Sequence, residues 1–124
     1  GKSLENLKIK MKQLSQTYNK NILIAETAYP FTLEWNDWTN NIVGFEEQLI
    51  LPEYPATIEG QRKFIKQIKR LTNEVENGIG FCYWGAELIA WKENQSVDAS
   101  HWENQALFDF DNKALPVFSE FEAE

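Results

Sequence analysis

Two short apolar runs constrain the fold of this chain more than any other feature. The first extends from Asn21 to Ala25 and the second from Ile79 to Trp84. Neither run alternates apolar with polar side chains, and short apolar runs without alternation are typical of strands that are covered on both faces in a parallel sheet. We therefore expect two buried parallel strands.

An amphipathic helix pattern precedes each apolar run. Thr57 is placed to cap the second helix, which Gly78 ends. The order helix, strand, long loop, helix, strand predicts consecutive α/β units with right-handed crossovers. The apolar stripe of the first helix comprises Leu4, Leu7, Met11, Leu14 and Tyr18, and that of the second comprises Phe64, Ile68, Leu71 and Val75.

Two parallel strands do not form a complete sheet, because each needs cover on both faces and neighbours on both edges. Closed barrels of parallel strands typically need about 250 residues. Residues 1–124 therefore read as one partial barrel domain of the α/β class. We expect its exposed edges and helix stripes to be covered by self-association of the chain.

Composition narrows the function classes. The net charge of −7 and the pI near 4.8 provide no basic stripe for nucleic acid or for an anionic membrane surface. No apolar run approaches the roughly 20 residues that span a bilayer, so we expect no membrane insertion. Cys82 is the only cysteine, which rules out an internal disulfide, and His101 is the only histidine, which argues against triad or zinc chemistry. We expect no cofactor and no required metal.

Aromatic side chains and one strand-end carboxylate point towards sugars. Several of the five tryptophans stand beside Asn, Asp or Glu, and flat indole rings next to polar groups suit sugar rings. Tryptophans also serve as ordinary core and edge residues, so composition leaves both readings open. Glu26 follows the first apolar run directly, at the strand end where barrel enzymes keep their active sites. On the residues alone, a catalytic carboxylate and a solvated glutamate both remain open.

An ordered series of motifs gives the chain a family resemblance. It begins with residues 24–30, from Ile24 to Pro30, and covers the chain from about Asn21 to Pro116. In this order the chain resembles the endo-β-1,4-galactanases, family 53 of the glycoside hydrolases. The later motifs are Trp35-Asn36-Asp37, Tyr54-Pro55-Ala56-Thr57, Gly60-Gln61, Gly78 to Trp84, and Trp102 to Asp109.

The resemblance implies the C-terminal part of a (β/α)8 TIM barrel, strands seven and eight with their flanking helices. It implies retaining endo-hydrolysis of β-1,4-galactosidic bonds in galactan and type I arabinogalactan, outside the cell, in the periplasm or at the cell surface. Retention needs two carboxylates about 5 Å apart. Glu26 matches the nucleophile, which needs a hydrogen-bond donor beside it. The family's acid/base glutamate follows an asparagine on the fourth strand, and the only such pair here, Asn73-Glu74, falls in the second helix. The isolated chain is therefore expected to be inactive.

The resemblance also implies sugar-binding residues. Trp84 is the expected stacking platform, with core packing as the alternative. Trp35, Asn36 and Asp37 lie on the long loop of residues 31–56, which is either a wall of the sugar groove or a self-packed loop. We also assign Tyr29 to substrate binding. The family commonly continues from this tryptophan with Glu-Pro, whereas this chain has Gly85, Ala86 and Glu87, so the place of Glu87 stays open.

Glu103 or Asn104 should tie down the loop after the second strand. Some bacterial relatives hold calcium near the barrel mouth, but no loop here has the EF-hand spacing. The alternative to an enzyme is a non-catalytic galactan-binding or self-assembling module that keeps the aromatic mouth.

Overall fold

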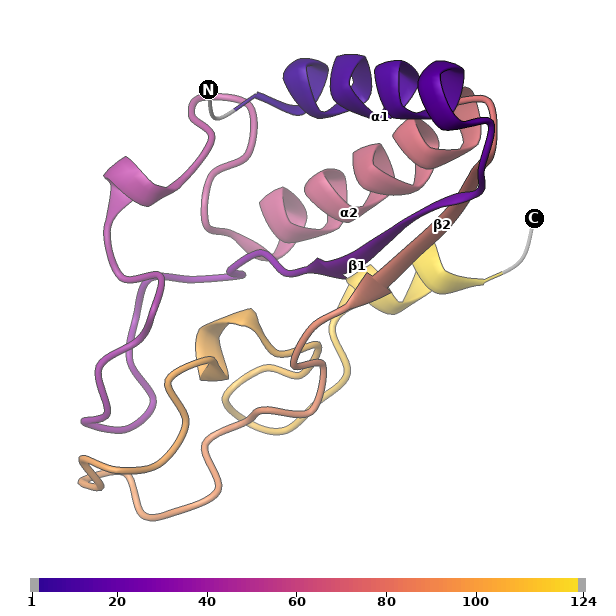
Figure 1. The fold of residues 1–124 in the computed structure, drawn as a ribbon. Coiled ribbons are helices and arrows are strands. Elements are labelled where there is room, and N and C mark those ends of the chain that lie inside the picture. Colours follow the sequence, from indigo (N-terminus) through magenta and orange to yellow (C-terminus); the bar gives the residue numbers. More distant parts are fainter. Residues whose placement is uncertain (1–2, 123–124) are drawn as a thin grey trace.

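The computed structural model describes residues 3–122 and contains the expected order of elements (Figure 1). Helix α1 spans Leu4–Tyr18, strand β1 spans Ile22–Thr27, helix α2 spans Ile58–Glu74 and strand β2 spans Gly78–Tyr83. This order confirms the prediction of two successive α/β units. Short 3-10 helices lie at Glu46–Gln48, Glu103–Gln105 and Pro116–Phe121.

Local hydrogen bonds set the bounds of both helices. The Ser3 hydroxyl accepts the Asn6 backbone N–H at 3.2 Å at the start of α1, and Asn19 ends that helix with a left-handed φ of 47°. The Thr57 hydroxyl accepts the Gly60 N–H at 2.9 Å, so the predicted cap of α2 is confirmed.

The two strands pair in parallel, as predicted, with Ile22 opposite Gly78 and Thr27 opposite Tyr83. The prediction that both faces would be covered is wrong within the described residues. Both helices lie on one side of the sheet (Figure 1), while Leu23 and Ile79 on the strands are exposed. The reason is that α1 and α2 provide a single covering layer, and each strand has one strand neighbour.

The hydrophobic core forms where α2 packs against the strands and against the loop segments that follow them. Ile65 and Ile68 of α2 are fully buried, and the Phe64 ring stacks on Tyr29 at a centroid distance of 4.2 Å. A smaller cluster of Met11, Leu71 and Val75 joins α1 to α2. Helix α2 is therefore the element around which the rest of the described chain packs.

A buried polar hub connects α2 to the segments that leave the strand ends. The side-chain amide of Gln61 donates to the backbone carbonyls of Tyr29 and Ala106, each at 3.0 Å. The Tyr83 hydroxyl donates to the Gln105 carbonyl at 2.7 Å and accepts the Tyr29 backbone N–H at 3.3 Å. Burial raises the pKa of Tyr83 to about 12. The hub thus joins the beginning of one loop to the end of the other.

Gly60 provides a test of how tightly α2 is seated. A Cβ at this position would lie 1.8 Å from the carbonyl oxygen of Pro55, so Gly60→Ala must displace backbone. We expect the substitution to lower the free energy of unfolding by about 1–3 kcal/mol, measured by urea denaturation. Gly44→Ala is the matched control, since its nearest neighbour would lie at 3.6 Å. Equal stability of the two variants would contradict this account of the packing.

The Tyr83 hydroxyl provides a second test. We expect Tyr83→Phe to destabilise the fold by about 1–3 kcal/mol, because the buried Gln105 carbonyl loses its donor. The raised pKa gives the pH dependence its sign: the stability from this phenol is complete below the ordinary pKa of 10.0 and is lost as the pH rises to about 12. Urea midpoints measured across that range should therefore fall less steeply in Tyr83→Phe. Tyr18→Phe on the exposed surface of α1 should match the wild type at every pH.

Candidate active site

Glu26 and Trp84 come together at the carboxyl ends of neighbouring strands. The Trp84 backbone N–H donates to the Thr27 carbonyl at 2.9 Å, which places Trp84 directly beside the end of β1. The Glu26 side chain is exposed, and Trp84 is 46% exposed. The strand ends therefore present a carboxylate and an indole ring at the edge where parallel α/β barrels hold their active sites.

The Glu26 carboxylate is not engaged by the structure around it. Within residues 3–122 it makes no hydrogen bond and no ion pair. A strand-end carboxylate without a structural partner is available to a ligand. The hydrogen-bond donor that a nucleophile needs does not come from this part of the chain.

Tyr29 lies elsewhere than we expected. Its side chain is 5% exposed, and its ring packs against Phe64 of α2. Its hydroxyl donates to the Tyr54 carbonyl and accepts the Ile50 N–H at 3.0 Å. The tyrosine turns towards α2 because its ring fills the core under the loop, so it offers no surface to a sugar, and our assignment of Tyr29 to substrate binding needs this correction.

Some side chains of the loop after β1 are buried and others are exposed. Trp35 and Trp38 are exposed, whereas Asp37 is 1% exposed. The Asp37 carboxylate accepts the Thr39 backbone N–H at 2.6 Å, which is an Asx turn. Its burial makes Asp37 a residue that shapes the loop rather than one that contacts sugar, which corrects our sequence-based assignment.

Asn36 and Glu87 complete the expected substrate-binding set. The Asn36 backbone N–H donates to the Glu103 carboxylate at 2.7 Å, and its side chain is partly buried. Glu87 is exposed in a turn that begins at Gly85. The structure brings Glu26, Trp84 and Glu87 to the strand ends, with Trp35 and Asn36 on the adjacent loop.

Glu103 and Asn104 stand on the loop after β2 and fasten it to the loop after β1. The Asn104 side-chain amide donates to the carbonyls of Thr32 at 2.9 Å and Val43 at 2.7 Å, and Glu103 accepts the N–H groups of Asn36 and Asp37. Both side chains therefore hold the loop after β1 in place through hydrogen bonds to its backbone. Burial raises the pKa of Glu103. Sequence reasoning missed Thr39, which carries no local motif, and it used Gln61 only as part of the Gly60-Gln61 motif, without a role for its side chain.

Glu74 lies at the opposite end of the sheet from Glu26, near the C-terminal end of α2. Its carboxylate accepts hydrogen bonds from Lys8 at 2.5 Å and Arg70 at 2.6 Å, and these bonds lower its pKa to about 2. A carboxyl held ionised in this way is unsuited to protonate a leaving group.

The described residues contain neither a candidate metal-binding cluster nor a candidate membrane-spanning helix. Between Ser3 and Glu122, no group of three or more His, Cys, Asp or Glu side chains is arranged to hold a metal ion. Within the same range, no helix is both long enough and apolar enough to cross a bilayer.

Comparison with known proteins gives consistent matches. The family model described as Glycosyl hydrolase family 53 matches residues 1–121. An uncharacterised protein of Niallia circulans is 39% identical over 124 residues, which is 98% of this chain and 34% of that protein. The arabinogalactan endo-β-1,4-galactanase of Cellvibrio japonicus is 36% identical over 125 residues, which is 98% of this chain and 32% of that enzyme.

The solved structures agree. The GH53 catalytic domain of Ignisphaera aggregans superposes with a TM-score of 0.85 at 36% identity, over 97% of this chain and 34% of that domain. This match confirms the predicted fold class, an α/β part of the family's (β/α)8 barrel. The chain spans about a third of the length of the curated relatives it matches. Because the family model covers nearly all of the sequence, the chain belongs to glycosyl hydrolase family 53.

Proposed function

We propose that this chain supplies the nucleophile half of a retaining glycosidase site that cleaves internal β-1,4-galactosidic bonds in galactan and type I arabinogalactan. Membership of family 53 and the galactanase names of the relatives in Cellvibrio japonicus and Bacillus subtilis support the substrate class. The observation that carries the proposal is the hydrogen bond between Trp84 and Thr27, because it sets an exposed indole beside the end of β1, the strand that carries Glu26.

In the proposed mechanism, Glu26 forms the first covalent bond to the sugar. Its carboxylate attacks the anomeric carbon, the bond to the leaving oxygen breaks, and a general acid protonates that oxygen. Water, deprotonated by the same second group, then displaces Glu26 and releases a sugar of retained configuration. The Asn73-Glu74 pair lies away from the strand ends, and the Glu74 carboxyl is held ionised by Lys8 and Arg70. The acid/base therefore comes from outside this chain. The chain alone is therefore inactive.

The exposed aromatic residues have a binding role in this proposal. Trp84 stacks on the galactose at the scissile bond, because a partly exposed indole beside the nucleophile matches the apolar face of a sugar ring. Trp35 and Asn36 extend the contact along the loop after β1, and Glu87 contributes from the turn after Trp84. Since the substrate is a polymer, we place the reaction outside the cell, in the periplasm or at the cell surface.

The second candidate function is a galactan-binding or self-assembling module without chemistry. Its support is that Trp35, Trp38 and Trp84 remain exposed in a chain whose described residues offer no donor to Glu26. Hydrolysis separates the two candidates, since a binding module retains galactan without cutting it.

Self-association is expected because the open face of the sheet carries exposed apolar side chains, including Leu23 and Ile79. Sedimentation velocity of the chain should give a dimer or a larger oligomer. Leu23→Lys should shift the distribution towards monomer, while Ile9→Lys on the exposed surface of α1 is the matched control. A compact monomer in dilute solution, with a native-like circular dichroism spectrum, would contradict this expectation.

The nucleophile role is tested in a chimera of the Cellvibrio japonicus galactanase, in which this chain replaces the matching third of that enzyme. We expect the chimera to hydrolyse β-1,4-galactan and the chain alone to be inactive. Glu26→Gln should lower kcat by a factor on the order of 10³ or more, because the amide cannot form the covalent intermediate. The assay is release of reducing ends from galactan.

Two controls separate loss of the nucleophile from loss of the fold. Glu5→Gln changes an exposed glutamate in the first turn of α1 and should leave kcat unchanged. Azide added to Glu26→Gly should restore cleavage of an activated galactoside and give a glycosyl azide of inverted configuration. Galactan hydrolysis by the chain alone would mean that a second carboxylate acts within it or in a partner copy, and would overturn the half-site proposal.

A further inference from the structure

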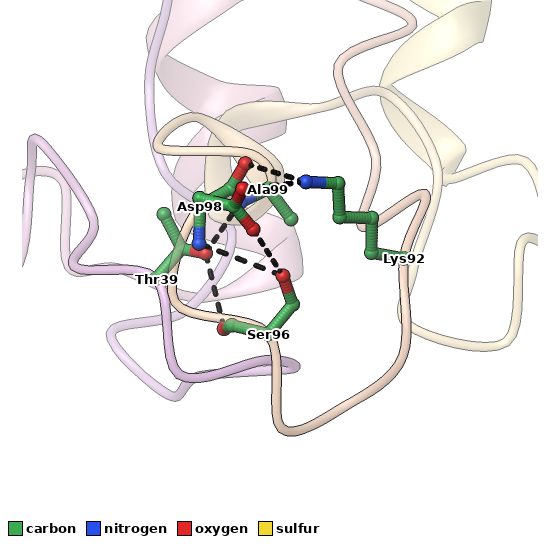
Figure 2. Close-up of polar contacts among 5 residues, drawn as sticks. All are labelled: Thr39, Lys92, Ser96, Asp98 and Ala99. Carbon is green, nitrogen blue, oxygen red and sulfur yellow. Dashed lines mark hydrogen bonds and ion pairs between the residues drawn. The ribbon is translucent and has the colours of Figure 1, made fainter.

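Thr39 is buried in a loop whose neighbouring side chains are exposed. It is 0% exposed, although Trp38 before it is 59% exposed and Asn40 after it is exposed too. Burial of a single threonine in such a loop requires that another segment covers it. Figure 2 shows this segment, residues 92–99 of the loop after β2, beside Thr39.

The Thr39 hydroxyl joins the two loops in both directions. It donates to the Ser96 carbonyl at 3.2 Å and accepts the Ala99 backbone N–H at 2.8 Å (Figure 2). The Trp38 backbone N–H donates to the same Ser96 carbonyl at 2.9 Å. Trp38 is thus held by its own backbone and through the side chain that follows it.

Residues 92–99, which bind Thr39, are held together by an ion pair and a hydrogen bond of their own. Lys92 pairs with the Asp98 carboxylate at 2.8 Å, and the Ser96 hydroxyl donates to the same carboxylate at 2.9 Å (Figure 2). The Asp98 carboxylate is largely exposed, and an exposed ion pair of this kind contributes little to stability. The hydrogen bonds of the buried threonine are therefore the stronger part of the connection between the loops.

The connection leaves exposed rings on both loops. Trp38 directly precedes Thr39, and Trp91 directly precedes Lys92, whose ammonium lies 4.6 Å from the centroid of the Trp91 ring. An exposed ring binds a sugar well when its backbone is fixed before binding, because less conformational entropy is then lost. Fixing one threonine orders the segment that presents Trp38.

We propose that Thr39 is a positioning residue, which locks the loop after β1 to the loop after β2 so that Trp38 presents a fixed stacking surface to a galactan chain. The role of Trp38 as a sugar contact rests on the proposed function. The position of Thr39 between the loops rests on the hydrogen bonds alone. A merely structural threonine would stabilise the loops without any effect that passes through Trp38.

The test is a double-mutant cycle in galactan binding by the chain, measured by isothermal titration with galactan oligosaccharides. Thr39→Val keeps the shape and removes the hydroxyl, and we expect it to weaken binding about tenfold, or about 1.4 kcal/mol. Trp38→Ala should weaken binding by a similar factor. The double variant should bind about as weakly as Trp38→Ala alone, because Thr39 acts through Trp38.

Conservative variants separate the hydroxyl from the fold. Thr39→Ser keeps the hydroxyl and should bind as the wild type does. Thr17→Val changes an exposed threonine of α1 and should also leave binding unchanged. Hydrogen exchange provides a readout independent of sugar: the Ala99 amide should exchange faster in Thr39→Val and at the wild-type rate in Thr39→Ser.

Each contrary result has a distinct meaning. Wild-type binding by Thr39→Val, or losses that add in the double variant, overturns the positioning role and leaves the proposed function standing. Unchanged exchange at Ala99 in Thr39→Val overturns the connection between the loops. Failure of the wild-type chain to bind galactan overturns the role of Trp38, and loss of hydrolysis in the wild-type chimera as well would count against the proposed function itself.

Discussion

The arrangement of the strand ends depends on the buried amide of Gln61. Long loops carry backbone carbonyls that no helix or sheet can pair, and a buried unpaired carbonyl is costly. Gln61 meets this need for Tyr29 after β1 and for Ala106 at the end of the other loop. Because Gln61 stands in the first turns of α2, it is held where the Thr57 cap and the contact of Gly60 with Pro55 seat that helix.

Farther from the core, other polar side chains also pair the backbone groups of the loops. Asn104 pairs two carbonyls of the loop after β1, Glu103 accepts two of its N–H groups, and Thr39 supplies both a donor and an acceptor. These polar side chains make the contacts between the loops, which leaves the indole rings free to remain exposed. A rigid surface of exposed aromatic rings is the kind of surface that recognises sugars. The hydrogen bonds of the polar side chains inside the loops therefore allow the aromatic rings to stay on the surface.

Periodicity predicted the elements but not the fate of single loop residues. The apolar stripe that contains Ile68 and Leu71, and the unalternating run before Glu26, predicted α2 and β1 because helix and strand periods are local properties of a sequence. The sequence favours a sugar-binding role for Asp37 and Tyr29, whereas both side chains are buried. Their burial depends on partners far along the chain: the contact between Asp37 and Glu103 joins residues 66 positions apart. No local pattern encodes such a partner.

Two features of β1 have a common cause. Leu23 on this strand is exposed, and Glu26 at its end has no donor among residues 3–122. Under the proposed function, a polypeptide that covered the open face would bury Leu23 and would also bring to the strand ends the donor and the acid/base that a Glu26 nucleophile requires. An unrelated apolar surface on this face would bury Leu23. It would still leave Glu26 without a hydrogen-bond donor and without an acid/base. Completion of the sheet and completion of the catalytic pair therefore coincide only when the covering chain is itself barrel-like, with its own carboxylate at the end of a strand.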